Sequence, residues 1–361
     1  MKEAKIMKKV LVLFGCVSSE HDISLISAKS VIENIPKDKY EPVLMGITKE
    51  GEWYLYNGDV EALPEDKWLQ SKENITPATI SLSRADHGIV VFGDEIQKIR
   101  IDVVFPVLHG KNGEDGTIQG MLQLAGIPFV GCDMISSACC MDKVYTNTLA
   151  DAAGIPQAKW LGVKEYDYSK EKASILARAE EYLGFPIFVK PANAGSSVGV
   201  SKATDKKSLD EAIIKAFKED SKLVLEEGIV GAEVEVAVLG NDEPVASVVG
   251  EVEACNDFYD FDAKYINSAS NLYIPARLPE DKAEEVRKAA VNAYKALGCS
   301  GLARVDFFVR HSDGAVMLNE PNTIPGFTSI SMYSKLFAAS GVPYPELVDR
   351  LICFATEKWE K

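Results

Sequence analysis

The C-terminal third of this 361-residue chain contains the pattern that most constrains its fold, a predicted β-hairpin. Residues 301–309 alternate small or apolar side chains with polar ones, so Arg304 and Asp306 fall on one face of a strand. A His-Ser-Asp-Gly turn signal precedes a second strand, on which Glu320 and Asn322 are also two residues apart. The pattern therefore predicts that a hairpin gathers these four polar side chains.

The same four side chains predict a magnesium site. Two carboxylates and one amide offer the hard oxygen ligands that Mg²⁺ prefers, and a cation beside an arginine is typical of phosphoryl transfer. A lone carboxylate pair is more often a solvated strand face. The combination of Arg-x-Asp with Glu-x-Asn, followed by Thr-Ile-Pro-Gly, favours the metal site.

The composition is that of an ordinary soluble globular protein, with 47% hydrophobic and 26% charged residues in a length that suits two or three domains. The formal net charge of -15 argues against a nucleic-acid partner and against a polybasic membrane patch. No apolar run reaches membrane-spanning length, and the N-terminus lacks the apolar stretch of a signal peptide. Seven cysteines without a CxxC spacing indicate buried free thiols, so we expect a cytoplasmic protein.

The N-terminal part of the chain alternates short β-branched strands with helices. This order predicts a three-layer α/β domain with a largely parallel sheet. The expected strands are 8–14, 40–47, 53–56 and 102–108, and the expected helices begin near Glu20 and cover 116–125. One long helix is expected next, at 133–153.

The pattern becomes α+β in the second half of the chain. We expect helices at 169–182, 208–217, 280–297 and 344–357, and strands at 185–189, 223–227, 233–239 and 244–253. A Gly-Asn-Asp turn joins the last two strands, which predicts an antiparallel pair. Residues 256–271 show no clean period, which is typical of a functional lid or a disordered loop.

A glycine-rich loop follows a predicted buried strand. Lys190 stands at the end of the strand, and Gly195 and Gly199 bracket Ser196 and Ser197. Such a loop lets backbone N–H groups and hydroxyls approach phosphates. It lacks the Gly-Lys-Ser/Thr ending of a Walker A loop, and a plain β-turn would explain the loop alone equally well. The lysine favours the phosphate interpretation.

Five other polar residues allow more than one interpretation. Glu226 and Glu233 flank a Gly-Ile-Val-Gly turn and in isolation would be solvated charges. In a nucleotide site, the backbone near Glu226 could contact adenine and Glu233 could bind the ribose hydroxyls. His109, in a glycine-rich loop after a strand, could orient a small carboxylate or be structural. Glu20 could cap its helix or hold a substrate ammonium group. Lys143, in mid-helix, would by itself be a surface lysine.

Taken together, these segments resemble the D-alanine–D-alanine ligases of the ATP-grasp superfamily. The matching segments follow the family order over nearly the whole chain: 18–25, 109–117, 190–199, 260–265, 304–306 and 320–331. The resemblance implies an α/β fold that is α+β in its C-terminal half. Its parts would be a preATP-grasp N-terminal domain at 1–130, a central ATP-grasp lobe at 131–228 and a C-terminal catalytic lobe at 229–361.

The resemblance implies an ATP-dependent ligase of peptidoglycan precursor synthesis. In this family, the carboxylate of one D-alanine attacks the γ-phosphate of ATP to give an acylphosphate, and the amine of a second D-alanine then displaces phosphate. The products are D-alanyl-D-alanine, ADP and phosphate. The family is typically homodimeric, and its small-molecule partners are D-alanine and ATP.

The resemblance also implies a role for each matching residue. The ligands of two Mg²⁺ (or Mn²⁺) ions would be Asp306, Glu320 and Asn322, and contacts to the nucleotide would come from Lys143, Lys190, Ser197, Glu226, Glu233 and Lys264. Glu20 would hold the first ammonium group, in one hydrogen-bonded set with Ser196 and Tyr265. Arg304 and the Gly326 N–H would form an oxyanion hole. His109 would lie near the first carboxylate, and Ser331 and Met332 would face the second D-alanine.

Two alternative functions stay open. Tyr265 stands where D-lactate-using ligases carry histidine, which favours a dipeptide-forming enzyme, but residues 51–54 and 108–116 also resemble D-alanine–D-serine ligases. One hydroxyl separates D-serine from D-alanine, and a site not built to reject it discriminates poorly. The other alternative is a non-catalytic ATP-grasp binding protein, which the complete set of metal ligands and lysines disfavours.

Overall fold

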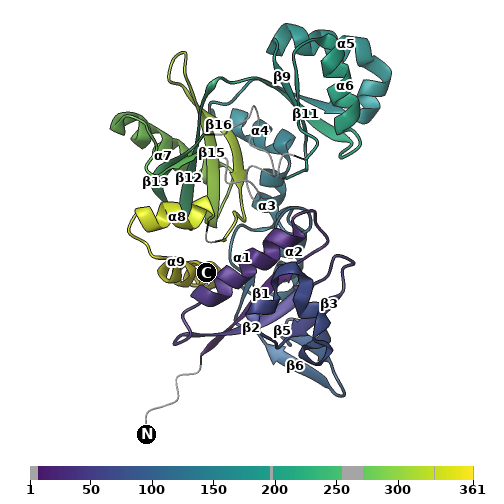
Figure 1. Cartoon of the computed structure of the whole chain (residues 1–361), viewed down its shortest axis with the longest axis vertical. Helices are drawn as coiled ribbons and strands as arrows, with labels where there is room; N and C mark the ends of the chain where they lie inside the picture. The colour runs from purple at the N-terminus through teal and green to yellow at the C-terminus, as the bar shows by residue number, and fades with distance from the viewer. Residues whose placement is uncertain (1–6, 196–197, 254–270, 329, 361) are drawn as a thin grey trace.

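Three β-sheets form the framework of the computed structural model, which describes residues 7–195, 198–253, 271–328 and 330–360. The first sheet (purple and blue) lies at the bottom of Figure 1, the second (teal) at the upper right and the third (green and yellow) towards the left. Their strands come from residues 8–106, 160–227 and 231–322. Each predicted domain range thus contains one sheet, while the domain boundaries stay a prediction.

The N-terminal sheet is built from seven strands. Their bounds are β1 (Lys8–Gly15), β2 (Tyr40–Ile47), β3 (Trp53–Tyr56), β4 (Ile75–Ile80), β5 (Gly88–Phe92), β6 (Ile96–Arg100) and β7 (Val103–Pro106). The order across the sheet is β6-β5-β4-β3-β2-β1-β7. The pairs β1–β2 and β1–β7 are parallel, and the other four pairs are antiparallel.

The prediction of a largely parallel sheet is therefore wrong. Strands β2 to β6 pair with their neighbours in sequence as an antiparallel meander, which needs no crossover helix. Three of these strands, β4, β5 and β6, were not predicted. The last of them exposes most of its side chains, so no apolar alternation marks it. Short 3₁₀ helices, η1 (Val60–Ala62), η2 (Pro64–Gln70) and η3 (Lys72–Asn74), link β3 to β4.

Helices cover both faces of this sheet, which confirms the three-layer prediction. On one face, α1 (His21–Asn34) packs in the same core as Val10 and Val12. On the other face, α2 (Thr117–Ala125) packs in the same core as Leu11 and Leu13. Successive residues of β1 point to opposite faces, so a strand buried on both sides is apolar throughout.

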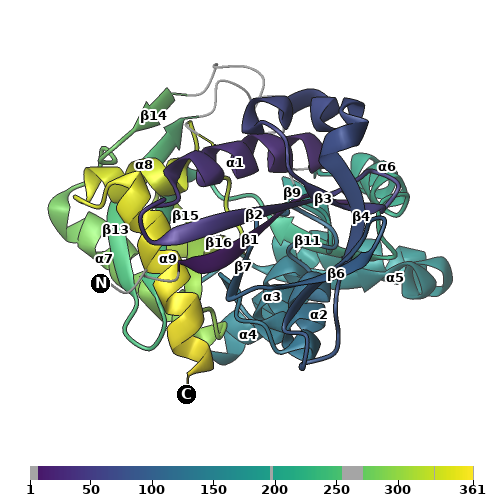
Figure 2. The same ribbon diagram turned by 90° about the horizontal axis from the view of Figure 1, so that it is seen from below.

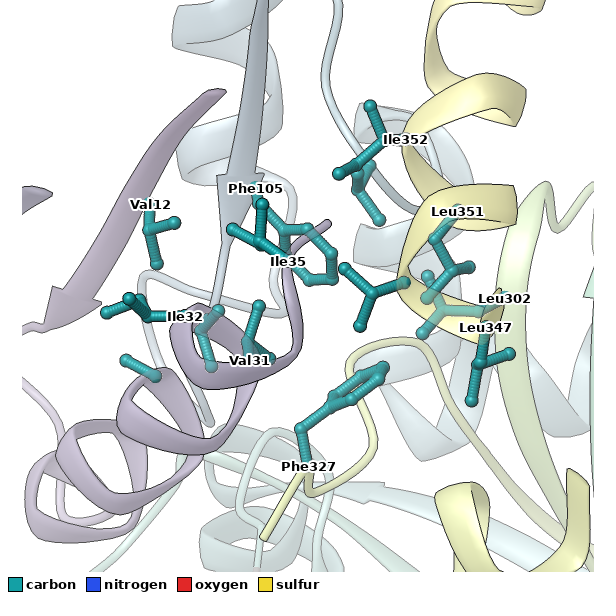
Figure 3. Packing of buried hydrophobic residues seen from close by; sticks show 14 of the residues in the cluster. Val12, Val31, Ile32, Ile35, Phe105, Leu302, Phe327, Leu347, Leu351 and Ile352 are labelled. Atoms are coloured by element: carbon teal, nitrogen blue, oxygen red, sulfur yellow. The ribbon is translucent and has the colours of Figure 1, made fainter. Parts of the chain in front are cut away.

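The last helix of the chain joins the first sheet to the third. Leu347 and Leu351 of α9 (Tyr344–Trp359) pack in the core that also contains Val31 and Leu302 (Figure 3). Figure 2, seen from below, shows α9 next to the N-terminal strands, with α8 (Met332–Ala339) close to it. The N-terminal and C-terminal ends of the chain therefore share one hydrophobic core.

The long helix predicted at 133–153 is wrong, because two helices occupy that range. They are α3 (Met134–Met141) and α4 (Lys143–Ala152). Asp142 between them has an extended backbone, and its side chain accepts hydrogen bonds from the N–H groups of Val144 and Tyr145. An aspartate in this position caps the second helix, and periodicity alone cannot show such a break. Lys143 is consequently the first residue of α4, not a mid-helix residue.

The second sheet is small and antiparallel. Its strands are β8 (Trp160–Lys164), β9 (Ile187–Pro191), β10 (Ser201–Ala203) and β11 (Lys222–Glu227), in the order β10-β9-β11-β8. Two helices, α5 (Glu165–Leu183) and α6 (Lys206–Ala216), pack on it through one apolar core. Both helices agree with the predicted ones apart from a few residues at their ends.

The third sheet has five strands in the order β14-β13-β12-β15-β16. Their bounds are β12 (Gly231–Gly240), β13 (Val245–Glu253), β14 (Asn271–Tyr273), β15 (Gly301–Arg310) and β16 (Val316–Asn322), with α7 (Glu280–Ala296) packed against them. The antiparallel pairing of β12 with β13 and the hairpin of β15 with β16 confirm two predictions. Helix α8 was not predicted, because most of its residues are buried and no polar face marks it.

Two findings bear on the cellular context of the chain. No helix in the described ranges is both long and apolar enough to cross a membrane. The structure describes six cysteines, all free: Cys16, Cys132, Cys140 and Cys299 are buried, Cys139 is partly exposed and Cys353 is exposed. The prediction of buried free thiols is right for four of these six. Cys255 lies outside the described residues.

Candidate active site

The β15–β16 hairpin brings together the four polar residues that predicted a magnesium site: Arg304, Asp306, Glu320 and Asn322. Asp306 is the cross-strand partner of Glu320, and Arg304 is the partner of Asn322. Directly opposed residues on an antiparallel pair point to the same face of the sheet. The register shifts after Asp306, so the regular pairing ends beside the site. The predicted juxtaposition is confirmed.

Arg304 binds the carboxylate of Asp306 with two hydrogen bonds. Its Nε donates to Oδ1 at 2.7 Å and its Nη2 to Oδ2 at 2.6 Å. The Nδ2 of Asn322 also donates to Oδ2 of Asp306, at 3.0 Å. This bidentate interaction holds the Arg304 guanidinium beside the carboxylates, where its positive charge offsets part of their negative charge.

Glu235 of β12 is a further carboxylate in this cluster and was not predicted. It is buried, it is the cross-strand partner of Asp306, and its Oε2 lies 3.1 Å from Nε of Arg304. The signal was present in the sequence, because Glu235 stands two residues after Glu233 on the same predicted strand.

The chemistry of this cluster fits a divalent cation. Three carboxylates, from Glu235, Asp306 and Glu320, lie in register on three adjacent strands, with one arginine among them. Such an excess of oxygen donors and negative charge suits Mg²⁺ or Mn²⁺. The assignment of individual residues as metal ligands stays a prediction.

A cavity of about 570 Å³ passes in front of the hairpin. Strands of the second and third sheets line it directly, and the N-terminal part of the chain lines it through Glu20, His109 and Glu114, which follow strands of the first sheet. The predicted site residues that line it are Glu20, His109, Lys143, Lys190, Glu226, Glu233, Arg304, Asp306, Glu320, Asn322 and Gly326. Residues that are far apart in the sequence therefore share one cavity large enough for small-molecule ligands.

Two other predicted site residues in the described part of the chain, Ser331 and Met332, are not among those that line the cavity. Ser331 and Met332 lie at the start of α8, where Ser331 Oγ hydrogen-bonds with Thr328 and Met332 is buried. Ser196, Ser197, Lys264 and Tyr265 lie outside the described residues.

Lys190, which is partly buried, and Glu226, which is buried, form an ion pair where the second sheet lines the cavity. The Nζ of Lys190 lies 2.6 Å from Oε2 of Glu226, whose Oε1 accepts a hydrogen bond from Asn147 at 3.1 Å. Burial alone would lower the pKa of Lys190, but the Glu226 carboxylate more than offsets this, and the pKa lies above its ordinary value. Lys190 is therefore a cation that faces the cavity.

Lys143 is directed towards the glycine-rich loop by its place at the start of α4. Its backbone N–H donates to the carbonyl of Ala192 at 3.0 Å, and its Nζ donates to the carbonyl of Ala194 at 2.8 Å. The interpretation of Lys143 as a surface lysine is wrong. The break at Asp142 explains why, since it turns the start of α4 towards this loop.

Glu20 stands at the N-cap position of α1, but its side chain makes no capping hydrogen bond, so the capping interpretation is wrong. The carboxylate lies against two glycine-rich loops. A Cβ atom at Gly110 would lie 2.5 Å from Oε2 of Glu20, and one at Gly195 would lie 2.8 Å from it. Both loops approach the carboxylate closely because they have glycine at these points.

His109 makes a hydrogen bond with each ring nitrogen. Nδ1 lies 3.0 Å from the carbonyl oxygen of Ile324, and Nε2 lies 3.0 Å from Oγ of Ser27. Burial lowers the pKa of His109, which favours the neutral ring. The predicted contact between His109 and a substrate carboxylate stays a prediction.

Glu114 also lines the cavity and was not predicted. Its Oε2 accepts the N–H of Gly110 at 2.8 Å, and its Oε1 accepts the N–H of Ile324 at 3.1 Å. Burial, followed by the nearby charge of Glu20, raises the pKa of Glu114 to about 8. The sequence signal was weak, because a Glu-Asp-Gly triplet in a loop usually indicates only a turn.

Two family descriptions match the chain. The family described as D-ala D-ala ligase N-terminus matches residues 9–132, and the family described as D-ala D-ala ligase C-terminus matches residues 149–353. Between them, they cover both the start of α1, where Glu20 lies, and the hairpin that holds Asp306.

Curated relatives are similar to this chain over its whole length. A D-alanine–D-alanine ligase of Acetivibrio thermocellus is 49% identical over 98% of this chain and 96% of its own length. A D-alanine–D-alanine ligase of Caldicellulosiruptor bescii is 52% identical over 97% of this chain and 95% of its own length.

Solved structures of ligases have the same fold. The VanG D-Ala:D-Ser ligase from Enterococcus faecalis superposes with a TM-score of 0.89 and is 43% identical, over 97% of this chain and 100% of its own. The D-alanine-D-alanine ligase from Coxiella burnetii superposes with a TM-score of 0.85 and is 34% identical, over 98% of this chain and 96% of its own. With two family matches and relatives this similar, the chain belongs to the D-alanine–D-alanine ligase family.

Proposed function

We propose that this protein joins two molecules of D-alanine, with ATP, to give D-alanyl-D-alanine, ADP and phosphate for peptidoglycan precursor synthesis. The observation that carries the proposal is the cavity in front of the β15–β16 hairpin, where Arg304, Asp306 and Glu320 face Lys190. The full-length similarity to curated D-alanine–D-alanine ligases supports the same reaction.

The nucleotide end of the cavity would hold ATP with divalent cations. Bound Mg²⁺ or Mn²⁺, in two sites, would supply neutralisation of the phosphate charge. Asp306, Glu320 and Asn322 would hold the ions. Lys143 and Lys190, with Ser197 of the glycine-rich loop and Lys264, would bind the phosphates, the backbone near Glu226 would contact adenine, and Glu233 would bind the ribose.

The other end of the cavity would hold the two amino acids. Glu20 would bind the ammonium group of the first D-alanine, with His109 near its carboxylate. Arg304 and the N–H of Gly326 would stabilise the negative charge that develops on the carbonyl oxygen when the second amine attacks. Ser331 and Met332 would face the second D-alanine. Ser196 and Tyr265 would join Glu20 in a hydrogen-bonded set that excludes water from the acylphosphate intermediate.

A phosphate-release assay with ATP and Mg²⁺ tests the reaction and its acceptor together. We expect rapid phosphate release with D-alanine alone, slower release when D-serine is the added acceptor, and none above the D-alanine rate with D-lactate. Mass spectrometry of the product identifies the dipeptide. Absence of phosphate release with every D-amino acid would favour the binding-only alternative.

D-alanine–D-serine ligation is the second candidate function. The observation that favours it is the superposition on the VanG D-Ala:D-Ser ligase with a TM-score of 0.89. The sequence identity of 43% to that enzyme is lower than the 49% and 52% to two curated D-alanine–D-alanine ligases, which favours D-alanine as acceptor. Faster ligation of D-serine than of D-alanine in a direct competition would make D-alanine–D-serine ligation the leading candidate function.

We also propose a homodimer in the cytoplasm. The proposal rests on the family resemblance, on a reaction that consumes ATP, and on cysteines that are free in the described part of the chain. Light scattering after size-exclusion chromatography would give about twice the 39.4 kDa of one chain for a dimer. A single species of 39.4 kDa would contradict the dimer.

A further inference from the structure

The segment 323–328, which follows β16, is bound by side chains from the N-terminal part of the chain. The N–H of Ile324 donates to Oε1 of Glu114 at 3.1 Å, and the carbonyl of Ile324 lies 3.0 Å from Nδ1 of His109. Three residues later, the N–H of Phe327 donates to Oγ of Ser27 at 3.4 Å. The N–H and the carbonyl of Ile324 and the N–H of Phe327 are thus all bound by side chains from the N-terminal part of the chain.

These hydrogen bonds have one consistent direction. The Ile324 carbonyl can only accept, so Nδ1 of His109 carries the hydrogen. In the neutral ring Nε2 then accepts from the hydroxyl of Ser27, and the oxygen of that hydroxyl accepts from the N–H of Phe327. Every donor in this chain of bonds has an acceptor, so the arrangement is self-consistent without a ligand.

Glu114 links this segment to its own loop. Its second oxygen accepts the N–H of Gly110 at 2.8 Å, so one carboxyl group binds two backbone donors from loops far apart in the sequence. A carboxyl group can accept at both oxygens, because the hydroxyl oxygen keeps a lone pair for an N–H donor even when the group is protonated. A glutamine in the same place has one acceptor oxygen, and its NH₂ group would face one of the N–H donors.

Ile324 lies midway between two groups of the proposed catalytic site. Asn322 is two residues before it and Gly326 two residues after it, and all three line the cavity together with Glu114 and Glu20. Gly110, whose N–H donates to Glu114, also lies against Glu20, since a Cβ atom at Gly110 would be 2.5 Å from Oε2 of Glu20.

We propose that Glu114 is a positioning residue, which binds the Gly110 and Ile324 N–H groups at once and so fixes the Gly326 N–H relative to the Glu20 carboxylate. The proposal rests on the proposed function, since it gives the Gly326 N–H the role of an oxyanion donor. Glu114 would bind no substrate itself. It would set the distance between the group that holds the first amino acid and the group that stabilises the reacting carbonyl.

Hydrogen exchange gives a readout that does not depend on activity. In Glu114→Gln, we expect the amides of peptides covering 323–328 to exchange about tenfold faster, because one of the two bonds is lost. Amides of β1 should exchange at the wild-type rate. Unchanged protection of 323–328 would overturn the proposal.

Asp115→Asn is the matched control in the same loop. Asp115 also accepts two backbone N–H groups, from Asn112 at 2.8 Å and Thr117 at 3.0 Å, but both donors lie within three residues of it in the sequence. Its replacement should leave the exchange of 323–328 unchanged. Faster exchange of 323–328 in Asp115→Asn, equal to that in Glu114→Gln, would show a general loosening of the loop and overturn the proposal.

Steady-state kinetics separate positioning from a purely structural role. In Glu114→Gln, we expect kcat to fall by about 10- to 100-fold while KM for ATP stays within about twofold, since loss of an oxyanion donor itself lowers kcat by about 10²- to 10³-fold. Glu114→Asp keeps both carboxyl oxygens, so its kcat should lie between those of Glu114→Gln and the wild type. If Glu114→Gln fails to fold, a reduced kcat in Glu114→Asp with unchanged KM for ATP provides the same test. Wild-type kcat in Glu114→Gln would overturn the proposal.

The two proposals fail in different ways. Wild-type protein that releases no phosphate with D-alanine would contradict the proposed function, whatever the exchange data show. Active wild-type protein with unaltered exchange and turnover in Glu114→Gln would overturn only the positioning role.

Discussion

Asp306 is the residue on which most contacts of the candidate site converge. Both of its oxygens accept hydrogen bonds from Arg304, and Asn322 donates to one of them. Its cross-strand partners, Glu235 and Glu320, are also acidic. Directly opposed like charges destabilise a sheet unless a cation lies among them, and one arginine provides only part of that charge.

We predict that Asp306→Asn lowers turnover by about 10²-fold or more, because a proposed metal ligand and the partner of Arg304 are lost together. Phosphate release with D-alanine measures the turnover, and Mn²⁺ binding followed by electron paramagnetic resonance measures the ion. Asp313→Asn, in the exposed turn of the same hairpin, is the matched control, since Asp313 pairs only locally with Arg310. Near-wild-type turnover and Mn²⁺ affinity in Asp306→Asn would remove Asp306 from the metal site.

At the scale of elements, the break between α3 and α4 decides where Lys143 points. Asp142 has an extended backbone, caps α4 through the N–H groups of Val144 and Tyr145, and forms an ion pair with Lys222. A continuous helix would instead carry Lys143 past the loop to whose Ala194 carbonyl it donates.

We predict that Asp142→Ala lowers the free energy of unfolding by about 1–2 kcal/mol through the lost cap, and also raises KM for ATP because Lys143 loses its position. Urea unfolding and ATP titration of the phosphate-release rate measure the two effects. Asp133→Ala is the matched control, because Asp133 caps α3 through the N–H of Ser136 and lies away from Lys143. The idea fails if Asp133→Ala and Asp142→Ala raise KM for ATP equally.

At the scale of the whole molecule, one cavity joins strands of the second and third sheets with segments that follow strands of the first sheet. A ligand that touches Lys190 of β9 and Asp306 of β15 would link the second sheet to the third. Binding to the folded state alone stabilises that state by mass action.

We predict that a non-hydrolysable ATP analogue with Mg²⁺ raises Tm, with a stabilisation of about 2.7 kcal/mol at 100 times Kd. Lys190→Ala should remove most of this shift, because the phosphates of the analogue lose their contact with a partly buried cation. Chelation of Mg²⁺ by EDTA should reduce it as well. Lys207→Ala is the matched control, since the side chain of Lys207 is 88% exposed. Differential scanning calorimetry measures the shift, and an equal shift in Lys190→Ala would contradict the assignment.

Some of this architecture could be predicted from the sequence because it depends on near neighbours. The pairing of Asp306 with Glu320 follows from two alternating strands and one turn, which are local features. The predicted helix at 133–153 failed because a single capping aspartate interrupts an otherwise continuous period. The parallel sheet failed because strand order depends on which strands find one another, not on the pattern within each strand.

By itself, the sequence determined the gathering of Arg304, Asp306, Glu320 and Asn322 on one hairpin, the glycine-rich loop after Lys190, and a resemblance that identified the ligase family. Only the tertiary structure decided which distant groups meet. Glu114 binds the N–H of Ile324, which is 210 residues away in the sequence, and His109 binds the carbonyl of Ile324, which is 215 residues away. No local period encodes such contacts, because their positions are set by how whole sheets and helices pack around a shared core.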